Sequence, residues 1–371
     1  MFRIRACRGS AGSLLACLVA ATPAAAQISP DETGWQIEAH IGGVTTGVPD
    51  SGKIDLPGPG RSYFIGAPFF RTTRIVPSWF FGDGALLFRQ SNAEHAIGPT
   101  DIVPLDDLLT GPAAERGGGL VFGVRARRHV AGRFGVEFGL DVAHSGPDWA
   151  GASRDAIEAS RASFVAAWSP LFVGSGSFTG ADVSAVASVD DGSAREVFAT
   201  AAVDVRLWSR GGDEIVAVAG GGVVFQTGDP PSATLTGHYQ GTFDGRIPYD
   251  ETDRVSIRIE TGDAAFVSLF GAGWRHRLTA RLSVTGDVRV LLHRSASRVV
   301  VSADPSLVLT SDRSRQLGLF FGPEPVLLLY NGAGSLVTSS LSPPAVHDFV
   351  TFESTGWERH VHASVGLAVR F

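Results

Sequence analysis

The sequence is poor in sulfur, in charge and in long apolar runs. Its 371 residues include two cysteines and one methionine, and Cys7, Cys17 and Met1 all lie within the first 26 residues. The remaining chain therefore forms no disulfide and offers no thiolate for catalysis or metal binding. Charged residues make up 18% of the chain, yet no apolar run approaches the roughly 20 residues that a transmembrane helix needs. The apolar residues must be spread over short segments.

The first 26 residues have the features of a secretory signal peptide. Arg3, Arg5 and Arg8 precede an apolar stretch over 12–21, and Ala24 and Ala26 form the small-residue cleavage site. We predict cleavage after Ala26. A lipoprotein box at residues 14–17 is the alternative, but little apolar sequence precedes its cysteine. A cysteine-free exported chain suits passage through an oxidising compartment.

Positive charge is scarce in the predicted exported chain. The sequence has 31 Lys and Arg residues against 37 Asp and Glu residues, and removal of the three signal-peptide arginines leaves 28 against 37. This excess of negative charge argues against nucleic acid as a partner.

Apolar residues then recur at every second position in eight segments, the pattern of β-strands with one apolar and one polar face. The predicted strands cover about residues 35–41, 120–126, 134–142, 197–207, 215–225, 266–275, 282–292 and 361–371. Secreted β-sandwiches show such alternation as well as membrane β-barrels. Two further features decide between these two folds.

The first feature is the asymmetry of the connections. Short turns alternate with long connections at about 45–119, 144–194, 227–263 and 294–357, as in outer-membrane barrels with short periplasmic turns and long outer loops. The second is the final strand, in which Val365, Leu367, Val369 and Phe371 alternate with polar or small residues. This strand resembles the C-terminal strand that bacterial outer-membrane β-barrel proteins present to their assembly machinery. The resemblance covers the last 11 residues, and otherwise the architecture alone. It implies a location in the bacterial outer membrane, with membrane lipids and the assembly machinery as partners.

We therefore predict an all-β fold, an antiparallel transmembrane up-and-down β-barrel of eight strands formed by residues 27–371 as one domain. Residues 233–243 and 254–260 also alternate, so ten strands is the alternative. Gly237 and Gly241 would leave the lipid face of the added strands thin, which favours eight. The long extracellular loops should be acidic and contain one short helix, capped by Ser153, running to Trp168 and stopped by Pro170.

With the apolar faces toward lipid, charged residues of both signs point into the barrel. An eight-stranded barrel has room inside for side chains alone, so these charges should pair and close the lumen. A water-filled channel for small solutes is the alternative. The predicted lumen network consists of Glu38, Arg125, Arg127, Glu137, Asp141, Asp204, Arg206, Arg281, Asp287, Arg289 and Arg370.

The first long connection is rich in aromatic residues, notably Trp79, Phe80 and Phe81. Disordered segments are poor in such residues. Two interpretations follow: the aromatic residues pack the connection onto the barrel rim as a lid, or they form an exposed recognition patch. We name the three residues as candidates for recognition.

Evidence for catalysis or metal binding is weak. His144 and His293 lie near serines, but no Gly-x-Ser-x-Gly motif occurs in a strand-to-helix setting. His360 and His362 share one strand face and could hold a metal, although we expect a solvated pair. Asp250, Glu251 and Asp253 lack the spacing of a calcium loop. The sequence thus predicts no catalytic residue, cofactor or metal. A surface interaction platform or structural envelope component is the leading hypothesis, followed by a small-solute channel and a lipid-modifying enzyme.

Overall fold

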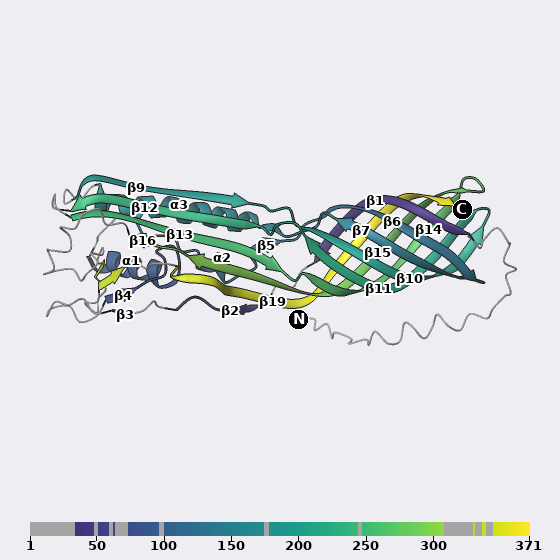
Figure 1. The fold of residues 1–371 in the computed structure, drawn as a ribbon, viewed down its shortest axis with the longest axis horizontal. Coiled ribbons are helices and arrows are strands. Elements are labelled where there is room, and N and C mark those ends of the chain that lie inside the picture. The colour runs from purple at the N-terminus through teal and green to yellow at the C-terminus, as the bar shows by residue number, and fades with distance from the viewer. Residues whose placement is uncertain are drawn as a thin grey trace, which may run out of the picture.

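The computed structural model describes residues 34–47, 51–58, 62–63, 73–95, 100–173, 178–243, 247–307, 329–330, 336–338 and 344–371. The predicted signal peptide lies outside these residues. The described chain divides into an antiparallel barrel and an elongated external part, which lie end to end (Figure 1). Among the described helices, none is both long and apolar enough to span a bilayer.

Eight strands form the barrel. They are β1 (Trp35–Gly47), β6 (Gly119–Ala131), β7 (Phe134–Ala143), β10 (Arg195–Arg210), β11 (Asp213–Thr227), β14 (Ala264–Arg277), β15 (Leu282–Ala303) and β19 (Val346–Arg370). Each pairs antiparallel with the next in this order, and β19 pairs with β1 to close the ring. The eight-stranded prediction is confirmed.

Turns at one end of the barrel are short. The β10–β11 turn places Gly211 and Gly212 at φ 61° and 98°, a conformation that glycine adopts without steric penalty and that matches the twist of a two-residue hairpin. At this end the backbone N–H of Phe371 donates to the carbonyl of Trp35, so the first and last barrel strands meet there.

The outer surface of the barrel is apolar. Most exposed aromatic side chains gather at its two ends, and the band between them carries Phe138, Phe270 and aliphatic side chains such as Ile41, Leu140 and Leu367. The aromatic residues near the short turns are Trp35, Phe134, Trp208, Trp274 and Phe371, and those near the opposite rim are Phe122, Phe225, Phe266 and Trp357. Two aromatic girdles around an apolar band, with a polar interior, are the arrangement of a barrel that spans an outer membrane.

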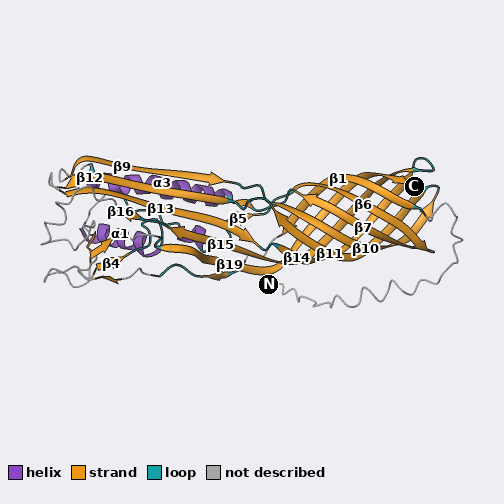
Figure 2. Ribbon diagram, in the orientation of Figure 1, coloured by secondary structure: helices purple, strands orange, loops and turns teal. Residues whose placement is uncertain are grey.

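The external part grows out of the barrel wall. Strands β15 and β19 are 22 and 25 residues long, and they stay paired with each other beyond the barrel, from Ser295↔Gly356 to Ala303↔Val346. Further strands continue the sheet on both edges of this pair (Figures 1 and 2). They are β13 (Ile247–Thr261), β12 (Ser232–Phe243) and β9 (Phe178–Asp190) beside β15, with β16 (Ser306–Leu307) on β13, and β2 (Lys53–Ile54) beside β19.

The ten-stranded alternative is therefore wrong. Strands β12 and β13 pair with each other and with β9 and β15 in the external sheet, and neither enters the ring. Their alternating pattern is real, but its apolar face packs against external helices rather than lipid. Ala233, Leu235, Val255 and Ile257 all lie in the external core.

Three helices accompany the external sheet: α1 (Gly82–His95), α2 (Asp106–Leu109) and α3 (Gly151–Phe172). Short strands form two further small sheets. One consists of β3 (Ser62–Tyr63), β4 (Thr73–Ile75), β17 (Leu329–Tyr330) and β18 (Leu336–Thr338), and the other of β5 (Ala114–Glu115) and β8 (Asp148–Trp149). Long loops with one short helix were expected, whereas the described parts of these connections hold three helices and several strands.

The predicted limits of the helix at 153–168 also differ from those observed. Helix α3 begins at Gly151 and extends to Phe172, so that Pro170 lies inside its last turn. Ser153 does not cap it; its hydroxyl instead donates to the carbonyl of Ala113 at 2.9 Å. The N–H groups of the first turn bond to Ala150 instead, because the backbone carbonyl of that residue lies at the helix start.

Trp79, Phe80 and Phe81 are fully buried, so the interpretation as an exposed recognition patch is wrong. They belong to the hydrophobic core that joins α3 to β12 and β13. The Trp79 ring meets Trp168 edge to face at 5.3 Å, and Phe80 stacks on Phe164 at 4.9 Å. Burial of these side chains stabilises the external part, because each aromatic ring removes a large apolar area from water.

Candidate functional site

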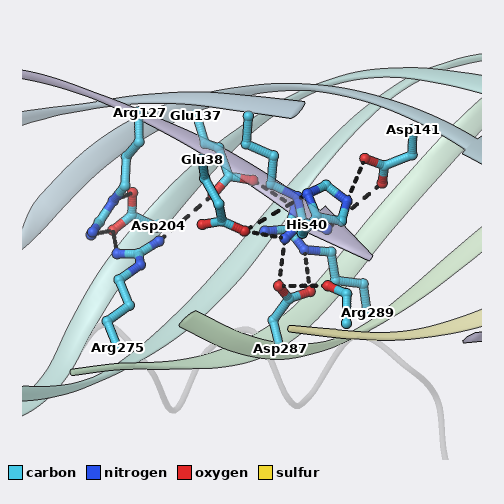
Figure 3. Close-up of polar contacts among 11 residues, drawn as sticks. Glu38, His40, Arg127, Glu137, Asp141, Asp204, Arg275, Asp287 and Arg289 are labelled. Carbon is cyan, nitrogen blue, oxygen red and sulfur yellow. Dashed lines mark hydrogen bonds and ion pairs between the residues drawn. The ribbon is translucent and has the colours of Figure 1, made fainter. Parts of the chain in front are cut away.

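The barrel interior holds a continuous network of buried charges (Figure 3). At its centre Arg125 on β6 bonds to Glu38 on β1 at 3.0 Å and to Asp287 on β15. Arg289, two residues further along β15, pairs with Glu137 at 2.5 Å and with Asp287 at 2.9 Å. These side chains face inward because their neighbours in the sequence point to lipid, as the pleat of a strand requires.

A second group lies nearer the short turns. Asp204 on β10 is fully buried. Both of its carboxylate oxygens accept hydrogen bonds from the Arg127 guanidinium on β6, and Arg275 on β14 lies 3.9 Å away. Such a bidentate ion pair fixes the guanidinium and the carboxylate relative to each other.

A histidine joins the network from β1. The Nε2 of His40 lies 3.0 Å from Asp141, and His362 lies 3.8 Å from the same carboxylate. Gly123 on β6 makes room for this ring, since a methyl group there would lie 2.5 Å from its Cε1 atom.

The structure brings together eight of the eleven residues predicted for the lumen network. The other three lie elsewhere: Arg206 is 3.9 Å from Glu214 near the turns, Arg281 is exposed and Arg370 is half-buried. Sequence reasoning missed Arg275, because the inward face of β14 consists mainly of Val267, Leu269, Gly271 and Gly273 and therefore shows no polar alternation.

Toward the outer rim the interior becomes apolar. A cluster including Val44, Val121, Phe198 and Leu291 fills this level, and the Phe198 ring packs edge to face on both His360 and His362 at 5.2 Å. His360 and His362 are both fully buried. The expectation of a solvated pair at a strand start is thus wrong, because β19 begins at Val346 and both histidines lie well inside it.

Four buried residues meet at the outer mouth of the barrel: Glu196 on β10, His293 on β15, and Glu358 and His360 on β19. We call them the mouth cluster. The two imidazoles stack at 5.1 Å with their Nε2 atoms 2.9 Å apart. Arg116 lies across the two carboxylates, with one guanidinium nitrogen 2.5 Å from Glu196 and 2.6 Å from Glu358. Strand pairing assembles these residues from distant parts of the sequence. Sequence reasoning singled out His293 and His360 separately, but it missed Glu196 and Glu358 and the meeting of all four.

The serine near His144 engages a carboxylate. Ser145 Oγ donates to Glu196 at 2.7 Å, and His144 packs against Phe122. This contact places the hydroxyl against an acid, which does not activate it as a nucleophile in the way an imidazole would.

Cavities adjoin the mouth cluster. One of about 280 Å³ is lined by Arg116, Glu196, Gln226, Ala264, His293 and Ser295. A second, of about 380 Å³, lies among Pro147, Gln226, Pro230, Glu260 and Asp263 at the junction with the external part.

Two carboxyl groups are buried in the external core. Asp253 accepts hydrogen bonds from the backbone N–H of Trp79 at 2.6 Å and from Ser78 at 3.0 Å, and Glu251 accepts one from the Tyr239 hydroxyl. Burial raises the pKa of Glu251 to about 8 and that of Asp253 to about 7. The three acidic residues at 250, 251 and 253 therefore do not form one site. Glu251 and Asp253 point into the core, whereas Asp250 is half-buried and pairs with His238 at 2.8 Å.

No protein-family model matches the chain, and no curated protein matches it either. Solved structures similar to it include a major outer membrane protein from Thermus thermophilus, at 15% identity and a TM-score of 0.27, covering 70% of this chain and 95% of that chain. The outer membrane protein OprG from Pseudomonas aeruginosa has 9% identity and a TM-score of 0.24, and the match covers 92% of this chain and 97% of OprG. CarO from Acinetobacter baumannii has 11% identity and a TM-score of 0.20, and the match covers 70% of this chain and 94% of CarO. The fold of this chain is accordingly defined by its own strand pairing.

Proposed function

We propose that this protein is a closed outer-membrane barrel that anchors a folded external domain, and that the external domain is a binding platform at the cell surface. The observation that carries the proposal is the continuity of β15 and β19. Both strands run from the barrel wall into the external sheet without interruption, so the barrel holds the external part rigidly rather than by flexible tethers. Membrane lipids and the outer-membrane assembly machinery are the partners that this location implies.

The interior contacts support closure. The Arg289–Glu137 pair crosses the lumen from β15 to β7 on the opposite side of the ring, and Arg125 on β6 reaches Asp287 on β15. Above them lies the apolar layer around Phe198, and above that the mouth cluster with Arg116. Three successive layers of buried side chains support a closed lumen, since an eight-stranded barrel has room inside for side chains alone.

The size of the external part supports a role beyond anchoring. An eight-stranded barrel needs only short connections, whereas ordering a residue costs about 1–2 kcal/mol of backbone entropy. The external chain offsets that cost with a hydrophobic core of its own. Such a construction is expected where selection acts on the outward-facing surface, as in proteins whose loops carry function on a rigid scaffold.

Conductance in a planar bilayer tests closure. The refolded full chain in potassium chloride is expected to show no step openings under conditions in which a porin of known conductance opens. Step openings of porin size would refute the closed barrel and favour the small-solute channel.

A trimmed barrel tests the platform. Replacing residues 48–118, 145–194, 228–263 and 295–357 with short Gly-Ser turns should leave a folded barrel, which is recognised by heat-modifiable gel mobility. In a deletion strain, the full chain should restore surface phenotypes such as adhesion and the trimmed barrel should not. Equal restoration by both would show that the external domain is dispensable and that the barrel alone carries the function.

A further inference from the structure

The mouth cluster has the donor set of a metal site. Glu196, His293, Glu358 and His360 each place one nitrogen or oxygen atom so that all four atoms lie within 4.8 Å of one another. All four side chains are buried, and three strands hold them in place. We infer that the mouth cluster binds one divalent transition-metal ion of the Zn²⁺ type. This inference stands apart from the proposed function, because the site would bind its ion whether or not the barrel conducts.

The distances fit such an ion. His293 Nε2 and His360 Nε2 are 2.9 Å apart, and the Glu358 carboxylate lies 3.5 Å from His360 Nε2 and 3.8 Å from His293 Nε2. Around a tetrahedral zinc ion with bonds of about 2.0–2.2 Å, neighbouring donor atoms are about 3.4 Å apart. These three groups would bind the ion after side-chain shifts of a few tenths of an ångström.

Glu196 occupies the place of a positioning residue. The second ring nitrogen of His360, Nδ1, lies 3.0 Å from Thr46 Oγ1 and 3.5 Å from Glu196 Oε2. A metal-binding histidine commonly donates its other N–H to a carboxylate, which fixes the tautomer and the orientation of the ring. Glu196 would thus keep the Nε2 of His360 free to face the ion and the Glu358 carboxylate.

The donor types select the class of ion. Two imidazole nitrogens with a carboxylate suit zinc, copper, nickel or iron. Calcium and magnesium require more ligands, and all of them oxygen. The adjoining cavity of about 280 Å³, which His293 and Glu196 both line, gives room for a water molecule as a further ligand.

Arg116 competes with the ion. Its guanidinium bridges Glu196 and Glu358, and it supplies the positive charge that two buried carboxylates require. A divalent ion would have to share Glu358 with this fixed charge. Removal of the arginine charge should therefore strengthen metal binding.

The test uses the full chain without an affinity tag, refolded in detergent and treated with a chelator. Zinc binding is measured by competition with a chromophoric chelator, and folding of every variant by heat-modifiable mobility. One Zn²⁺ per chain is expected. Both His293→Gln and His360→Gln should weaken binding at least about 100-fold, and Arg116→Gln should strengthen it at least about 10-fold. His144→Gln, which removes an exposed imidazole at the same rim, should leave the zinc affinity unchanged.

Three results would overturn the inference. They are unchanged zinc affinity in folded His293→Gln or His360→Gln, weaker binding in Arg116→Gln, and displacement of the zinc by an equal concentration of Ca²⁺ or Mg²⁺. Should His360→Gln fail to fold, His293→Gln carries the test, because its ring contacts the cluster without the added packing of Phe198 on His360.

Discussion

Buried charges in the barrel interior depend on their partners. Asp204 and Arg125 lie almost entirely out of water, where an ion without a counter-charge costs several kcal/mol. Each is compensated by more than one opposite charge. The network therefore tolerates burial only while it stays complete, which makes single residues in it sensitive to substitution.

Asp204→Asn removes one charge while keeping the side-chain shape. It should lower the free energy of unfolding of the barrel by about 3–5 kcal/mol, because Arg127 loses its buried counter-charge. Urea unfolding in lipid vesicles, followed by heat-modifiable mobility, measures the change. The control is Glu353→Gln, which breaks the exposed pair with Arg298 and should cost less than about 1 kcal/mol. Similar values for the two variants would mean that Asp204 is solvated in the folded barrel.

Helix α3 docks on β12 through a position that requires glycine. A methyl group on Gly237 would lie 2.5 Å from the ring of Phe164, which is itself fully buried beside Trp168. The absence of a side chain on the strand thus allows the helix to approach closely. In a membrane-facing strand Gly237 would leave the lipid face thin. In the external sheet it leaves the space that the Phe164 ring occupies.

Gly237→Ala should loosen that docking. Overpacking of this kind costs about 1–3 kcal/mol, and the external part should become more sensitive to limited proteolysis while the barrel keeps its heat-modifiable mobility. Gly151→Ala, at the exposed start of the same helix with no atom within 4 Å of the added carbon, should have no effect beyond about 0.5 kcal/mol. Equal proteolysis of both variants and the parent chain would contradict the close approach.

The external core should be less stable at alkaline pH. The pKa values of Glu251 and Asp253 are raised on folding, mainly by burial, from 4.5 and 3.8 to about 8 and about 7. The folded state then binds more protons than the unfolded state between these values, so its stability is greatest below pH 4 and falls as the pH rises to about 8.

Urea unfolding of the external part, followed by tryptophan fluorescence, should show a decrease of at least about 1 kcal/mol between pH 5 and pH 9. Glu251→Gln, which carries no charge at any pH, should reduce this dependence to the part that Asp253 contributes. Glu260→Gln, at a partly exposed position, should leave it unchanged. A parent chain with the same stability at both pH values would show that the two carboxyls are hydrated.

Assembly of the protein in the membrane should depend on the end of β19 at the short-turn side. Phe371 is 75% exposed beside the apolar face formed by Val365, Leu367 and Val369, in the aromatic girdle. Deleting Phe371 should reduce the folded form in membranes several-fold, because the girdle residue and the assembly signal are lost together. Phe371→Tyr, which keeps an aromatic ring, should assemble normally. Normal assembly of the deletion variant would show that this residue is not recognised.

Periodicity along the chain was enough to predict the eight barrel strands and the inward direction of Glu38, Arg125, Asp204 and Asp287. Both follow from a period of two, which is a local property of a strand between lipid and a packed interior. The same local signal occurred in β12 and β13, where it could not tell a lipid face from a face covered by helix α3.

The arrangement beyond the barrel depends on contacts between segments far apart in the chain. The buried state of Trp79 depends on α3, β12 and β13, which are distant in the sequence. The mouth cluster joins residues 196, 293, 358 and 360 through the register of β15 with β19 and the closure of the ring. Spacing along the chain carries no information on such contacts, because they arise from which strands become neighbours.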